Sequence, residues 1–156
     1  MRRKAGMAIA AGAVIVGVGG WIGSRGSAYA QGPATPGCTD ATIRGTYGIQ
    51  MQGTIPGPGG SQAAIGVAVR TYDGAGGFTQ IDNLKGAATG IVFDRPGSGT
   101  YQVNEDCTAV ALLQPGPGII IEERMVIVNH GNELRSISAS PPPIMVSAVQ
   151  LRIDRR

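Results

Sequence analysis

The chain has 156 residues, of which 13 are Lys or Arg and 10 are Asp or Glu, so its formal net charge is +3. Four of the basic residues, Arg2, Arg3, Lys4 and Arg25, lie among the first 30 residues, where there is no acidic residue. Residues 31–156 therefore have nine basic residues against ten acidic ones, which excludes a strongly basic nucleic-acid-binding surface. Charged residues make up only 15% of the chain and aromatic residues only 4%, which excludes a disordered polyelectrolyte and a stacking platform for single-stranded nucleic acid.

Residues 1–30 have the pattern of a secretory signal peptide. Basic residues precede an apolar stretch at 5–22, and an A-x-A cleavage signature at 28–30 places the cut before Gln31. An uncleaved membrane anchor is the alternative, because the apolar stretch is nearly long enough to span a bilayer. The Arg2-Arg3 pair leaves both general secretory and twin-arginine export open. The sequence predicts a secreted or periplasmic protein that contacts the membrane only through this segment, if the segment is retained.

Predicted export determines how the two cysteines, Cys38 and Cys107, are interpreted. In an oxidising compartment two cysteines have one possible pairing, so a Cys38–Cys107 disulfide is expected. Two buried or reactive thiols are the alternative. His130 is the only histidine and lies beside Gly131-Asn132, so a turn residue is expected there. A Cys/His metal site is not expected, and neither a metal nor another cofactor is predicted.

Residues 31–37 form a Pro- and Gly-rich leader that we expect to be flexible, and residues 38–156 suit a single domain. Clusters of Gly, Pro, Asn and Asp separate short apolar or alternating runs, and no stretch of 12 residues has a helical apolar stripe. Strands are predicted at 44–52, 62–72, 78–85, 87–93, 99–103, 108–114, 119–129, 133–140 and 144–154. Loops or turns are predicted between them at 54–61, 73–77, 94–98, 104–106, 115–118, 130–132 and 141–143.

Short strands at regular spacing predict an all-β fold, an antiparallel up-and-down barrel of about eight or nine strands. Closure of the sheet removes the exposed edges that an open sheet of this size would have. A β-sandwich is the alternative. The only tryptophan, Trp21, lies in the predicted signal peptide, so the core tryptophan of an immunoglobulin-like sandwich is missing.

Four motifs carry a resemblance to a known family. They are Cys38-Thr39, RGTYG at 44–48, YDGAGGFT at 72–79 and GTYQVNEDCT at 99–108. Together they resemble a group of small secreted bacterial β-proteins of unassigned role with an allene oxide cyclase-like, dirigent-like barrel. The resemblance implies an eight-stranded antiparallel barrel with an apolar lumen. The motifs consist mostly of turn residues, and no catalytic residue of that family is carried over.

The longest predicted strand has charged residues at its centre and apolar residues on both faces. One face carries Glu123, and the other carries Glu122 and Arg124. If the first face points into the barrel, Glu123 is desolvated, its pKa is raised, and it can move a proton or hold a ligand. Alternatively, Glu122 and Arg124 form an outer pair, and Glu123 lies at the barrel mouth or pairs with an arginine such as Arg70 or Arg135. A register slip of one residue exchanges Glu122 and Glu123.

Asp82 shares a strand face with Gln80 and is a second candidate. Opposite Glu123 it would form a pair of carboxylates suited to acid–base chemistry, but a solvated strand face is the expected reading. Tyr47 and Tyr101 either pack in the core or line an apolar pocket.

These residues support three hypotheses. The first is an exported barrel that binds a small apolar ligand in its lumen, with Glu123 as polar anchor and Arg70, Tyr47 and Tyr101 as further contacts. The second is an isomerase or cyclase in which Glu123 or Asp82 is the catalytic carboxylate, although no catalytic motif is present. The third is a non-catalytic secreted or envelope module that binds through its loops. No nucleic-acid partner is expected, and the sequence predicts no oligomeric state.

Overall fold

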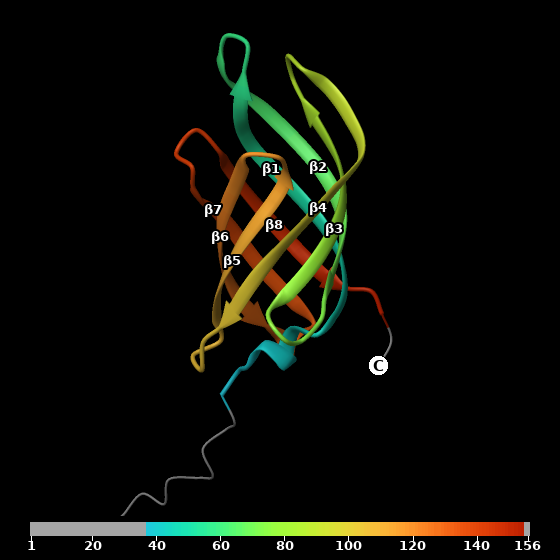
Figure 1. Cartoon of the computed structure of the whole chain (residues 1–156), viewed down its shortest axis with the longest axis vertical. Coiled ribbons are helices and arrows are strands. Elements are labelled where there is room, and N and C mark those ends of the chain that lie inside the picture. Colours follow the sequence, from blue (N-terminus) through green and yellow to red (C-terminus); the bar gives the residue numbers. More distant parts are fainter. Residues whose placement is uncertain (1–36, 155–156) are drawn as a thin grey trace, which may run out of the picture. The chain divides into compact units, whose positions relative to one another are not determined.

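A computed structural model of the protein describes residues 37–154, which form a closed antiparallel barrel (Figure 1). Each strand pairs with the next along the chain, and β8 pairs with β1 to close the sheet. The prediction of an all-β up-and-down barrel is therefore confirmed, and the β-sandwich alternative is wrong. The strands are β1 (Gly45–Gly57), β2 (Gly60–Tyr72), β3 (Gly77–Gly86), β4 (Gly90–Val103), β5 (Thr108–Gly116), β6 (Ile119–Val128), β7 (Glu133–Ser140) and β8 (Met145–Arg152).

The strand count is eight rather than nine because the expected turn at 94–98 lies inside β4. The pairing of β4 with β3 shifts register there: Asp82 is opposite Arg95, whereas Leu84 is opposite Val92. Asp94 has a positive φ of 48°, and its N–H donates to the side chain of Asn83 at 3.2 Å. Residues that resemble a turn therefore form a β-bulge, which bends the strand without ending it.

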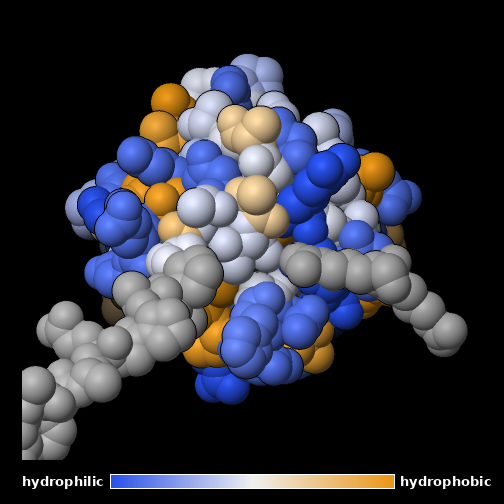
Figure 2. All heavy atoms as spheres, turned by 90° about the horizontal axis from the view of Figure 1, so that it is seen from below, coloured by the Kyte–Doolittle hydropathy of each residue, from blue (hydrophilic) through white to orange (hydrophobic). Residues whose placement is uncertain are grey.

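The alternation within each strand separates an inner from an outer face. Tyr47 and Ile49 of β1 point inward, as does Met125 of β6, and all three are buried. In β2 the apolar face is the outer one, because Ile65 and Val67 are 62% and 56% exposed. Seen from the end where the chain enters the barrel, the visible surface is mostly hydrophilic, with apolar side chains around its periphery (Figure 2).

One end of the barrel is closed by aromatic side chains. The Tyr72 ring lies at the centre of this cluster, with centroid distances of 5.4 Å to Tyr47, 5.5 Å to Phe78 and 5.1 Å to Tyr101. The short 3-10 helix η1 (Asp40–Ile43) covers the cluster, and its Ile43 is fully buried. The short helix η2 (Asn129–Gly131) links β6 to β7. The core therefore fills the end of the barrel where the chain enters.

The sulfur atoms of Cys38 and Cys107 lie 1.90 Å apart, at disulfide distance, in agreement with the expected pairing. Cys38 precedes η1, and Cys107 lies in the turn between β4 and β5. The N–H of Cys38 also donates to the carbonyl of Glu105 in that turn at 3.2 Å. The segment leading into β1 is thus fastened to the closed end of the barrel.

The predicted signal peptide, its cleavage site and most of the leader at 31–37 lie outside the described residues. Within the described range, no helix has the length and apolar character needed to cross a membrane.

Candidate functional site in the barrel lumen

A cavity of about 280 Å³ occupies the barrel interior toward the end opposite η1. Residues next to the β1–β2, β5–β6 and β7–β8 connections surround it, and most of its walls are apolar. The apolar lining residues are Ile49, Met51, Ile55, Pro56, Leu84, Leu113, Pro115, Ile119, Ile121, Ile144, Val146 and Ala148. At this end the β1–β2 and β3–β4 hairpins rise above the other strands (Figure 1).

A buried ion pair forms the centre of the cavity floor. Nη1 of Arg70 donates to Oε2 of Glu123 at 2.7 Å, and Nη2 donates to Oε1 at 3.0 Å. The side chain of Arg70 is 2% exposed and that of Glu123 is 13% exposed. A bidentate pair of this geometry holds both side chains in fixed orientations. The guanidinium carbon of Arg70 also lies 4.4 Å from the centre of the Phe78 ring, which belongs to the aromatic cluster.

Gln80 connects this ion pair to a second one. Its Oε1 accepts from Nε of Arg70 at 2.8 Å, and its Nε2 donates to Asp82 at 2.8 Å. Asp82 in turn accepts from Nε and Nη2 of Arg95, at 3.0 and 3.1 Å. Each carboxylate therefore has its own arginine, and the two do not form a pair that shares a proton.

On the other side, the floor continues through Tyr72. Its hydroxyl accepts from Nη1 of Arg70 at 3.1 Å and donates to Oε1 of Gln150 at 2.9 Å. Nε2 of Gln150 donates to Oγ of Ser136 at 3.4 Å. Hydrogen bonds thus link β2, β3, β6, β7 and β8 across the lumen, which fixes the shape of the floor.

Burial and the ion pair set the charge states of the floor. Burial by itself lowers the pKa of Arg70, but its electrostatic interactions and hydrogen bonds with Tyr72 and Glu123 outweigh burial and raise this pKa above its ordinary value. Burial raises the pKa of the Tyr72 hydroxyl. Arg70 is therefore a cation and Tyr72 a neutral phenol at neutral pH.

The structure brings three of the predicted site residues together, namely Glu123, Arg70 and Asp82. The expected solvated face for Asp82 is wrong, since its side chain is 1% exposed and points into the lumen. Within the described chain, Tyr47 and Tyr101 do not line this cavity, because their hydroxyls bond the carbonyls of Gly131 and Asp40 at the closed end.

Sequence reasoning missed four polar lining residues: Arg95, Ser136, Ser138 and Gln150. Arg95 was missed because the sequence at 94–98, Asp-Arg-Pro-Gly-Ser, resembles a turn. Gln150 carries a recognisable signal, since it alternates with Val146 and Ala148 on one face of the last predicted strand.

Glu122 and Arg124 lie on the outer face of β6, where they form an ion pair of 2.5 Å. Arg124 is 59% exposed and Glu122 is 28% exposed. Glu123 is thus the carboxylate of β6 that points into the lumen, and the pattern of the sequence alone did not decide this.

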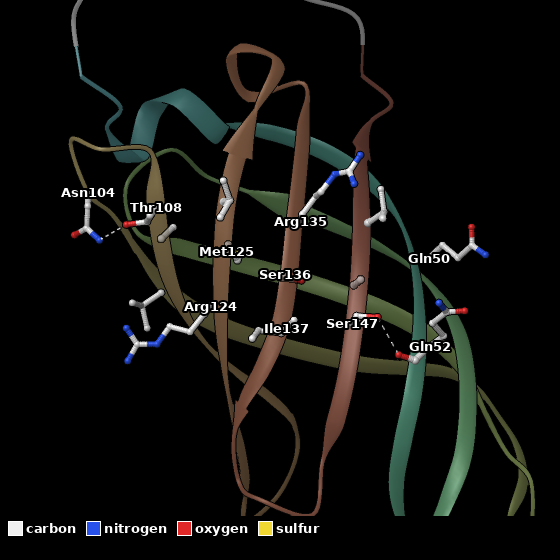
Figure 3. A pocket seen from close by; sticks show the side chains of 15 residues that line it. Gln50, Gln52, Asn104, Thr108, Arg124, Met125, Arg135, Ser136, Ile137 and Ser147 are labelled. Carbon is white, nitrogen blue, oxygen red and sulfur yellow. Dashed lines mark hydrogen bonds between the residues drawn. The ribbon is translucent and has the colours of Figure 1, made fainter.

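A larger hollow of about 850 Å³ lies on the outer wall, over β5–β8 and β1 (Figure 3). Arg124 and Arg135 border it, and each is paired with a glutamate of its own strand. Both arginines are more than half exposed. The lumen is the stronger candidate site, because its polar groups are buried and fixed in position whereas those of the outer hollow are solvated.

Among the described residues, no group of three His, Cys, Asp or Glu side chains is placed to hold a metal ion. No family model, curated protein or solved structure matches the chain.

Proposed function

We propose that the protein binds a small, predominantly apolar molecule in the barrel lumen, with Glu123 as its polar anchor. The observation that carries the proposal is the cavity of about 280 Å³, whose apolar walls stand on a floor of fixed polar groups. Its volume lies just below the roughly 300–1,000 Å³ of ordinary ligand pockets, so the ligand is small. Apolar walls supply affinity, while a few fixed polar groups orient the ligand.

Export to the periplasm or the exterior is the second part of the proposal. The signal-peptide pattern at 1–30 supports it, and a cysteine pair at disulfide distance is compatible with an oxidising compartment. The strand number and connectivity also agree with what the resemblance to allene oxide cyclase-like barrels implies, and we retain that relationship as part of the proposal. Ligand binding does not depend on it.

The test uses N-phenyl-1-naphthylamine, an uncharged apolar dye whose fluorescence rises in apolar surroundings. Ala148 lines the cavity, so Ala148→Phe fills it, whereas the neighbouring Ser147 points outward. We expect the native protein to bind the dye, Ala148→Phe to bind it at least tenfold more weakly, and Ser147→Phe to bind it like the native protein. Equal binding by both variants, or no binding by the native protein, contradicts the proposal.

A further inference from the structure

The carboxylate of Glu123 keeps unused capacity to accept hydrogen bonds. Each of its oxygens accepts one hydrogen bond from Arg70, and each carboxylate oxygen offers two lone-pair directions. Glu123 lines the cavity and is 13% exposed, whereas Asp82 is 1% exposed. A ligand group that donates a hydrogen bond therefore finds an acceptor on the floor at Glu123.

Ser136 provides the complementary donor. Its Oγ accepts from Gln150 at 3.4 Å, and its own O–H has no acceptor among the described residues. Ser136 lines the same cavity from β7, next to β6, where it pairs with Met125 two residues along from Glu123. Glu123 thus supplies an acceptor and Ser136 a donor on neighbouring strands.

The charges around the cavity are balanced. Four charged side chains line it, Arg70 and Arg95 as cations and Glu123 and Asp82 as anions, and they form two ion pairs. A charged ligand would bring an uncompensated charge into a largely apolar cavity, which is costly. An uncharged ligand leaves the balance intact.

We propose that the natural ligand is an uncharged molecule whose polar end is a hydroxyl group, which donates to Glu123 and accepts from Ser136. A hydroxyl is the small uncharged group that does both with one atom. This inference rests on the proposed binding function and adds the chemical class of the ligand. An ether cannot donate a hydrogen bond, and a carboxylate or an ammonium group carries a charge.

The experiment measures displacement of N-phenyl-1-naphthylamine by four probes of similar size: octan-1-ol, its isomer 1-methoxyheptane, octanoate and octylammonium. We expect octan-1-ol to bind about tenfold or more tightly than each of the other three, since loss of a hydrogen bond to a charged group weakens binding by about that factor. If the ether binds as tightly as the alcohol, or if either ion binds best, the inference is overturned while the binding function stands. If the dye itself does not bind, both are overturned.

Two variants test the residues named. Ser136→Ala removes the donor, so the affinity for octan-1-ol should fall several-fold while that for 1-methoxyheptane stays within twofold. Glu123→Gln leaves Arg70 without its counter-charge, so octanoate should gain at least tenfold relative to octylammonium. Circular dichroism confirms that each variant is folded, and Ser136→Ala tests the inference even if Glu123→Gln does not fold. If Ser136→Ala keeps the ligand preferences of the native protein, the inference is contradicted. The same holds if both variants fold and both keep those preferences.

Discussion

Arg70 is almost fully buried and makes four hydrogen bonds. Its guanidinium donates to Gln80, Tyr72 and both oxygens of Glu123, so its charge is compensated inside the lumen. Loss of one member of a buried ion pair leaves the other as an uncompensated charge, which costs more than the pair itself contributes. The stability of the floor therefore depends on Arg70 and Glu123 being present together.

Arg70→Met should lower the free energy of unfolding by about 3–5 kcal/mol, because Glu123 loses its partner. The double variant Arg70→Met/Glu123→Leu should be less destabilised than Arg70→Met alone, since neither charge then remains. Urea unfolding measures both. Arg135→Met is the matched control, because Arg135 is 67% exposed and its ion pair contributes at most about 1 kcal/mol. A double variant less stable than the single one would argue against this account.

At the scale of elements, alternation along a strand showed which residues share a face but not which face is inside. The alternation at 119–129 placed Glu123 with Ile121 and Met125, and the structure keeps that set together. In β2 alternation likewise puts Ile65 and Val67 on one face, yet this apolar face is outside and Arg70 is inside. Hydrophobicity did not reveal the direction, because the lumen of this barrel contains a polar network.

β4 shows a second limit of the sequence. Pro and Gly within Asp94–Ser98 predicted a turn, since both residues favour turns. They are equally compatible with a β-bulge, and whether the strand continues depends on its pairing with β3, which short-range sequence signals do not contain. The fold class was predictable from turn spacing, whereas the position of Arg95 was not.

The turn between β2 and β3 provides a pH-dependent prediction. Asp73 accepts hydrogen bonds from the N–H groups of Ala75 and Gly77 at 2.7 and 2.9 Å, and these bonds lower its pKa. A lowered pKa in the folded state stabilises the protein above the unfolded-state pKa of about 4, and this stabilisation is lost as the pH falls through the folded-state pKa. Asp73→Asn should therefore lower Tm at pH 7.

The difference in Tm between the native protein and Asp73→Asn should begin to shrink below about pH 4 and continue to shrink as the pH falls further. Thermal unfolding followed by circular dichroism across this range measures it. Asp106, whose hydrogen bonds with Thr108 also lower its pKa, provides an independent repeat through Asp106→Asn. A gap in Tm that is the same at both ends of the pH range would show that the charge of Asp73 is not responsible.

At the scale of the whole molecule, the two ends of the barrel differ in role. The closed end contains the aromatic cluster, η1 and the cysteine pair, and the other end contains the cavity. Neither the cysteine pair nor η1 lines the cavity, so changes there leave its walls in place, whereas Tyr72 belongs to both the aromatic cluster and the cavity floor.

The cysteine pair spans 69 residues of chain, and a disulfide closing such a loop stabilises a protein by about 4 kcal/mol in the chain-entropy description. The double variant Cys38→Ser/Cys107→Ser should lose about 2–4 kcal/mol of unfolding free energy and still bind N-phenyl-1-naphthylamine when folded. Urea unfolding with and without reductant provides the comparison. Equal stability of the oxidised and reduced protein would mean that this bond does not stabilise the barrel.

Closure between β1 and β8 also determines how the barrel folds. Tyr47 of β1 is opposite Arg152 of β8, a separation of 105 residues, and every other strand is placed between them. A contact this distant in sequence requires the entropy of a long loop to be lost first, which is typical of domains that fold in milliseconds to seconds. Until β8 arrives, β1 presents an unpaired edge on which another chain can pair. The barrel is thus most exposed to aggregation during synthesis and refolding.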